Sequence, residues 1–87
     1  MLESLHAMIR EAQQHGRETV VVDSATVAGI GTSMRLNRVE SQGLFKRLVE
    51  GNYLRVRGAL SDYQYSGELR IEVEYLTDQG LREIGEI

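Results

Sequence analysis

The residues best suited to chemistry are basic and amide side chains spaced four apart. Arg38, Gln42 and Lys46 would lie along one side of a helix. Arginine pairs with guanine, glutamine with adenine, and lysine with guanine or phosphate. Arg35 stands just before this segment, where phosphate contacts are common, and Arg47 adds positive charge. The pattern fits contact with nucleic acid, but it also fits the solvated face of an ordinary amphipathic helix.

The charge of the chain is unevenly distributed. The net charge of −3 argues against a general nucleic-acid binder. Six of the ten Lys and Arg residues nevertheless lie between residues 35 and 57, which carry a net charge of +4. Residues 1–34 carry −2 and residues 58–87 carry −5. The positive charge is therefore concentrated in the segment that has the spacing of four.

Other site chemistries lack their residues. His6 and His15 would lie about 180° apart on a helix, so they cannot chelate one metal ion, and there is no cysteine. Gly29-Ile30-Gly31 is not a dinucleotide fingerprint, because the third glycine would fall at Met34. The acidic residues near the C-terminus fit a solvated face. We expect no enzyme, no catalytic residue, no metal and no cofactor.

The size and composition are those of one small domain that spans residues 1–87. The apolar fraction is 41% and the charged fraction is 26%. No apolar run approaches the roughly 18 residues of a membrane span, and the first residues do not form a signal peptide. We therefore expect a cytoplasmic protein without membrane contact. A chain this short has a modest core, so a homodimer is a plausible way to bury more surface.

The first half of the chain has the periodicity of helix, strand and helix. Residues 2–15 predict an amphipathic helix with Leu2, Leu5 and Ile9 on one face. The β-branched run 19–22 predicts a strand at the edge of a small sheet. Asp23 and Ser24 are both competent N-caps for a second helix that ends near Ser33.

The central segment predicts a longer helix over residues 38–50. Asn37 and Glu40 have the spacing of a capping box, and Gly51-Asn52 is a suitable stop. Gly43 would leave a bare patch, which permits close helix packing or close approach of a partner. The inward face of this helix would consist of Ser41, Leu44, Phe45 and Leu48.

The last third predicts a two-stranded ribbon and a short helix. One strand covers residues 53–57, and the other covers 68–75 with Leu69, Ile71, Val73 and Tyr75 on one face. Thr77 would cap the final helix. The overall expectation is an α+β fold with three helices, a small antiparallel sheet and a short C-terminal helix.

This order resembles winged helix-turn-helix domains of the MarR and PadR type. The stretch "LFKRLVEGNYL", residues 44–54, is similar to the end of their recognition helix and the entry into the β-hairpin wing. The stretch "YLTDQG" is similar to their junction between the last strand and the last helix. The segment between Ala28 and Ser41 is about three residues longer than the common pattern. The resemblance covers roughly residues 20–84 and implies a DNA-binding fold.

The expected wing has an unusual charge for a DNA contact. Residues 58–67 contain no Lys or Arg, although wings that contact DNA usually supply them. If the hairpin centres on residues 64–65, Arg57 faces Glu72 and Arg55 faces Glu74, which would partly neutralise both arginines. Tyr63 and Tyr65 could contact a partner or pack on their own hairpin.

We therefore expect a small winged-helix DNA-binding protein and transcriptional regulator that uses a helix at about 38–50. The residues proposed to contact duplex DNA are Arg35, Arg38, Gln42, Lys46 and Arg47. A homodimer surface could combine Leu2, Leu5 and Ile9 with Ile84 and Ile87. The alternative is a winged-helix module that binds a protein partner without DNA, with Tyr63 and Tyr65 as anchors.

Overall fold

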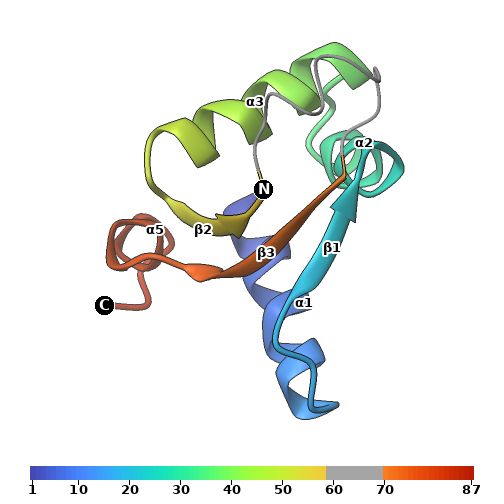
Figure 1. Cartoon of the computed structure of the whole chain (residues 1–87). Helices are drawn as coiled ribbons and strands as arrows, with labels where there is room; N and C mark the ends of the chain where they lie inside the picture. Colours follow the sequence, from blue (N-terminus) through green and yellow to red (C-terminus); the bar gives the residue numbers. More distant parts are fainter. Residues whose placement is uncertain (59–69) are drawn as a thin grey trace.

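The computed structural model describes residues 1–58 and 70–87, which form an α+β fold (Figure 1). Those ranges contain four helices and one three-stranded antiparallel sheet. The elements are α1 (Leu2–Gln14), β1 (Val20–Asp23), α2 (Ser24–Ser33), α3 (Arg38–Glu50), β2 (Leu54–Arg57), β3 (Arg70–Leu76) and α5 (Asp78–Glu83). Their order and approximate bounds confirm the predicted elements, except that residues 68–69 of the predicted strand lie outside the described residues.

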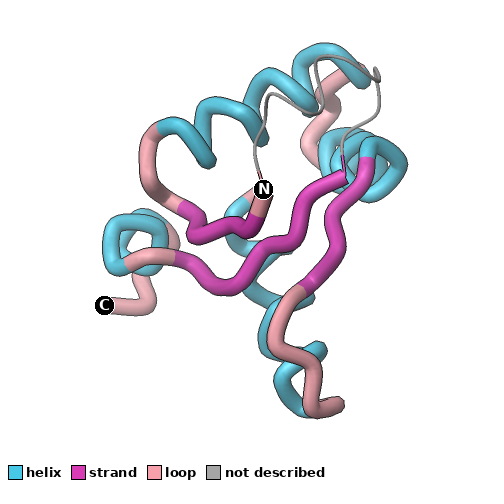
Figure 2. Tube along the Cα trace, viewed as in Figure 1, coloured by secondary structure: helices cyan, strands magenta, loops and turns pink. Residues whose placement is uncertain are grey.

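The strand β3 is the centre of the sheet, between β1 and β2 (Figure 2). Val20 lies opposite Val73, and Val22 lies opposite Ile71. Paired residues in an antiparallel sheet point to the same face, and here that face is covered by the core. The prediction that the valine run forms an edge strand is confirmed.

A β-bulge corrects two predictions about the ribbon. Arg55 lies opposite Tyr75 and Val56 lies opposite Val73, so Glu74 is an extra residue on β3. An extra residue reverses the alternation of side chains beyond it. Tyr75 is therefore 49% exposed, and Leu76 is buried in the place where the regular pattern predicts Tyr75. The prediction that Arg55 faces Glu74 is wrong, whereas Arg57 does lie opposite Glu72.

The core joins the sheet to one face of each long helix. Leu2, Leu5 and Ile9 of α1 are at most 6% exposed, so they are core residues of this chain and the prediction that they form a dimer surface is wrong. Ile87 at the C-terminus is 66% exposed. Within residues 1–58 and 70–87, the buried apolar residues are Leu2, Leu5, Ile9, Val22, Val27, Phe45, Leu54, Ile71, Val73 and Leu76.

Side-chain caps fix where α2 and α3 begin. The Thr26 backbone N–H donates to the Asp23 carboxylate at 2.7 Å, and this hydrogen bond lowers the pKa of Asp23. The cap is therefore complete at neutral pH and is lost only when acid protonates the carboxylate. At α3, Glu40 N–H donates to Asn37 Oδ1 and Asn37 N–H donates to the Glu40 carboxylate. The predicted capping box is confirmed.

The junction after β3 is held by Thr77 and Gly80. Thr77 Oγ1 donates to the Asn52 carbonyl at 2.6 Å and accepts from the Gly80 N–H, so it caps α5 and ties it to the end of α3. A side chain at Gly80 would collide with the carbonyl oxygen of Tyr53. The segment from Leu76 to Gly80 thus joins α5 to the start of β2.

The helices α2 and α3 cross in close contact at Gly31 and Ser41. Both residues are buried, and a Cβ built on Gly31 would lie 2.6 Å from Ser41 Cβ. Ser41 Oγ donates to the Asn37 carbonyl at 2.7 Å, which satisfies the buried hydroxyl locally. The absence of a side chain at Gly31 therefore sets the distance between α2 and α3.

We predict that Gly31→Ala destabilises the protein by about 1–3 kcal/mol, because the added methyl group overpacks the helix crossing. Gly29→Ala is the matched control on the same helix. Within the described residues nothing lies within 4 Å of a Cβ at Gly29, so this change should stabilise α2 by up to about 1 kcal/mol. Urea denaturation measures both. Equal effects of the two substitutions would contradict the close crossing.

Candidate nucleic-acid interface

Among the residues that the structure describes, α3 packs against the core on one side and is open on the other. Ser41 and Phe45 are fully buried, while Leu48 and Val49 pack against the core from its edge. Leu44, predicted to face inward, is half-buried. Because the buried residues fix the rotation of the helix about its axis, they also determine which side chains face solvent.

The cations of α3 occupy the open side and its first turn. Successive residues rotate by about 100°, so Lys46 lies about 140° around the helix from buried Ser41 and Arg47 lies about 120° from it on the other side. Arg38 is only about 60° from Ser41, and its exposure follows from its place as the first residue of the helix. Arg38 and Lys46 are about 80° apart and face the same side.

Two carboxylates of α3 reduce this positive charge locally. Glu50 lies 4.0 Å from Lys46 Nζ, an exposed ion pair of small energetic value. Glu40 is held at the capping box by the Asn37 N–H. In residues 1–58 and 70–87, no carboxylate lies within 4.0 Å of Arg35, Arg38 or Arg47. Three of the four predicted cations therefore keep an uncompensated charge within the described chain.

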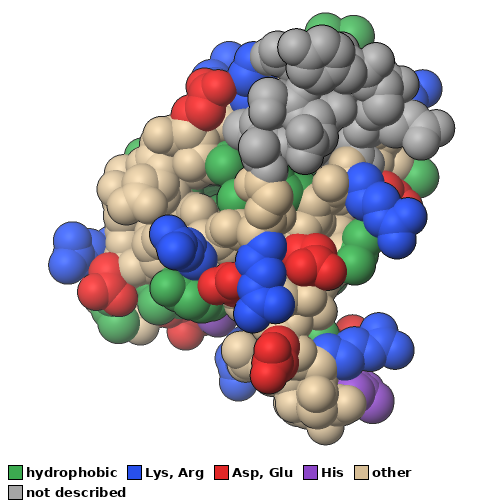
Figure 3. All heavy atoms as spheres, in the orientation of Figure 1, with side chains coloured by type: hydrophobic (Ala, Val, Ile, Leu, Met, Phe, Trp, Pro, Cys, Tyr) green, Lys and Arg blue, Asp and Glu red, His purple; other side chains and the backbone are tan. Residues whose placement is uncertain are grey.

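Arg57 of β2 differs from the arginines of α3, because it is paired with carboxylates. Arg57 Nε donates to the Glu74 carboxylate at 2.5 Å, and Arg57 Nη2 lies 3.8 Å from Glu18. The hydrogen bond that Arg57 donates to Glu74 raises the pKa of the Arg57 guanidinium. Acidic and basic side chains are mixed over the sheet, as Figure 3 shows. The prediction of partial neutralisation is confirmed for Arg57, with Glu74 rather than Glu72 accepting the hydrogen bond, whereas no ion pair of Arg55 is found within the described residues.

Arg35 occupies an unfavourable backbone conformation beside α3. All four described helices end with the same two backbone hydrogen bonds. The residue after the C-cap donates to the carbonyl three residues earlier, and the next residue donates to the carbonyl five residues before itself. In this motif the residue after the C-cap has a positive φ. That residue is Gly16 after α1, Asn52 after α3 and Gly85 after α5, which all tolerate the left-handed region. After α2 it is Arg35, with φ of 61°. Arginine is thus present where local stability favours glycine or asparagine.

The remaining predicted site residues divide into two groups. Gln42 is half-buried between Arg38 and Lys46, so it projects less than its neighbours. Tyr63 and Tyr65 lie outside the described residues.

Sequence reasoning missed Val39, which is 79% exposed in the first turn of α3. A signal was present, because Val39 lies about 160° from inward-facing Ser41 on the predicted helix.

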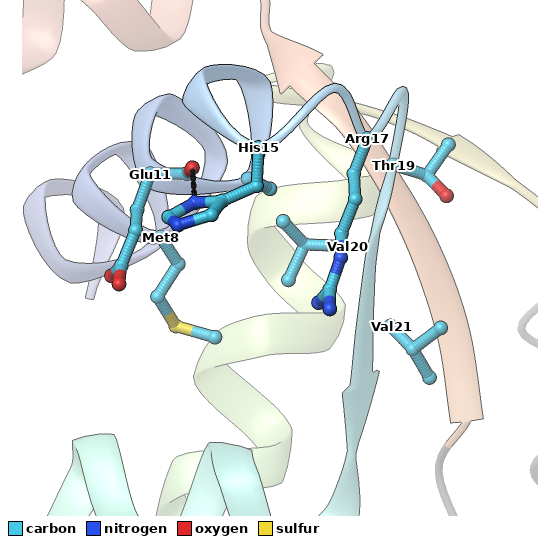
Figure 4. A pocket seen from close by; sticks show the side chains of 8 residues that line it. Met8, Glu11, His15, Arg17, Thr19, Val20 and Val21 are labelled. Atoms are coloured by element: carbon cyan, nitrogen blue, oxygen red, sulfur yellow. Dashed lines mark hydrogen bonds between the residues drawn. The ribbon is translucent and has the colours of Figure 1, made fainter.

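A separate hollow of about 590 Å³ lies between α1 and β1 (Figure 4). Met8, Val20 and Val21 supply apolar walls, and His15 and Arg17 supply polar groups. His15 Nδ1 is hydrogen-bonded to the backbone carbonyl of Glu11 at 2.9 Å, and this contact restrains the imidazole ring. In the described ranges no three His, Cys, Asp or Glu side chains are grouped to hold a metal ion. This hollow is remote from α3 in sequence and contains no paired catalytic groups.

Among the helices of the described chain, none has the length and apolarity needed to cross a bilayer. Comparisons of this chain with protein-family models, with curated proteins and with solved structures found no match. A functional proposal for this chain must therefore be argued from its residues and their arrangement.

We predict that Arg35→Gly stabilises the fold by up to about 1 kcal/mol, because glycine adopts the left-handed conformation without a Cβ penalty. Arg35→Ala is the control, since it removes the charge but keeps the Cβ and should give no such gain. Thermal denaturation monitored by circular dichroism measures the difference between the two variants. A lower midpoint for the glycine variant would show that the arginine side chain contributes stability.

Proposed function

We propose that this chain is a winged helix-turn-helix protein that binds duplex DNA and regulates transcription. The element order α1-β1-α2-α3-β2-β3 and the strand order β1-β3-β2 support the fold assignment. The tight crossing of α2 and α3 supports their assignment as the helix-turn-helix pair. In this assignment α3 is the recognition helix.

The observation that carries the proposal is the exposed, uncompensated charge at and around α3. Arg35, Arg38 and Arg47 are exposed and have no carboxylate within 4.0 Å in the described chain. A rigid core contact at Phe45 holds the helix that carries two of them. Arg38 and Arg47 lie about 180° apart around α3, so they are suited to phosphates on the two sides of a major groove.

Arg35 adds a second line of support. A conformational cost of about 1–2 kcal/mol at a non-glycine residue needs a compensating gain. No ion pair within the described chain supplies that gain. A phosphate contact next to the N-terminus of α3 would supply it, since helix N-termini favour anions.

The mechanism follows from the position of each cation. The first turn of α3 enters the major groove, where Arg38 reaches a guanine edge or a phosphate. Arg35 and Arg47 contact phosphates on either side and fix the orientation of the helix. Lys46 joins them when phosphate displaces its weak pairing with Glu50. A single module buries little surface, so useful affinity requires a dimer or tandem sites.

The alternative function is a winged-helix module that binds a protein partner. The net charge of −3, the Lys46–Glu50 pair and the neutralised Arg57 favour it. Such a module would use α3 or the ribbon as its docking surface. The two functions differ in a simple respect, because only the first requires binding to duplex DNA that weakens with salt.

We predict that Arg38→Ala combined with Lys46→Ala abolishes the retention of duplex DNA in a gel shift at low salt. The two changes remove one cation from the first turn and one from the open side. Loss of the exposed Lys46–Glu50 pair costs the fold only about 0.3–0.5 kcal/mol, so the variant should remain folded.

The matched control is Arg10→Ala combined with Arg82→Ala, which changes the net charge equally at exposed positions on α1 and α5. This control should bind nearly as well as the parent. In the same assay Glu40→Gln should bind several-fold more tightly, because glutamine also completes a capping box but carries no charge. Parent-like binding by the α3 double variant would refute the assignment of α3 as the DNA-contacting helix.

A further inference from the structure

Val39 is an exposed apolar side chain in the first turn of α3, directly after Arg38. Its exposed fraction of 79% exceeds that of Ile87 at the chain terminus, which is 66%. A β-branched residue is a weaker helix former than alanine, and an exposed one contributes little packing. Neither helix propensity nor the core of the described chain therefore explains valine at this position.

The position of Val39 is that of a base-reading side chain. It is the second residue of α3, directly after Arg38, and lies about 160° from buried Ser41. Side chains in the first turn of a recognition helix reach base edges in the major groove. In that groove the apolar group that distinguishes one base from the others is the C5-methyl group of thymine.

The neighbouring surface permits a close approach. Gly43 lies one turn after Val39 on the same open side, about 40° around the helix. In the described chain, apart from Gly43, its two neighbours and the adjacent backbone of α3, no atom lies within 4 Å of a Cβ placed at Gly43. The bare backbone there lets the helix and the groove come close enough for the short valine side chain to touch a base.

We infer that Val39 packs against the C5-methyl group of a thymine and thereby specifies an A·T pair at one position of the bound DNA. This inference rests on the proposed function and adds a sequence preference to it. Arg38 and Arg35 hold the first turn against the backbone, and Val39 excludes water from the thymine methyl. Cytosine and guanine present no methyl group at that place, so they are disfavoured.

The test begins with selection of bound duplexes from a random-sequence library by the parent protein. One thymine in the selected site is then replaced by deoxyuridine, which keeps the base pair and removes only the methyl group. We expect this replacement to weaken the parent by about fourfold, the equivalent of about 0.8 kcal/mol for one methyl group. Each selected thymine is replaced in turn to locate the position.

The same replacements are made with Val39→Ala, which favours the helix and should therefore remain folded. This variant should bind the thymine and deoxyuridine duplexes equally at the position where the parent distinguishes them. The control Val21→Ala shortens an exposed valine on β1 and should keep the parent's fourfold preference.

The outcomes separate this inference from the proposed function. Parent protein that binds duplex DNA but tolerates every deoxyuridine replacement would overturn the role of Val39 and leave DNA binding in place. A preference that persists in Val39→Ala would likewise assign the methyl contact to another residue. Failure of the parent to bind any duplex at low salt would overturn both proposals.

Discussion

The close crossing of α2 and α3 is the constraint on which the position of α3 depends. Gly31 has no side chain, so Ser41 fits against α2, and Phe45 one turn later enters the core with no exposed surface. These contacts fix the rotation of α3 about its axis. That rotation determines which side chains lie on the open side of the helix, among them Lys46, Arg47 and Val39.

Local signals in the sequence predicted most of the fold, because the helices of this chain have well-defined start and stop signals. Asn37 and Glu40 form the capping box that their spacing indicates, and Asn52 takes the left-handed conformation at the end of α3. The face containing Leu2, Leu5 and Ile9 was predicted, but its burial against this chain's own sheet was not. Periodicity identifies an apolar face without identifying what covers it.

The predictions were wrong where one extra residue changes the alternation of a strand, or where the pairing of two strands determines which side chains meet. An extra residue at Glu74 exchanges the places of Tyr75 and Leu76, and no residue type signals a bulge there. The ion pair of Arg57 with Glu74 depends on the same bulge. The left-handed Arg35 was also unpredictable, because the sequence expectation for that conformation is glycine or asparagine. Four of the proposed contact residues were nevertheless found on or beside α3 as exposed or half-exposed cations.

The central claim is that these cations bind the phosphates of duplex DNA, and the dependence of affinity on salt tests it most directly. The logarithm of the binding constant falls linearly with the logarithm of salt concentration, with a slope of about −0.9 for each phosphate neutralised. If two to four of the cations around α3 contact phosphates, the slope per protomer on a random duplex should lie between about −1.8 and about −3.6. A slope near zero, or no binding at the lowest salt concentration, would contradict the account and favour a protein partner.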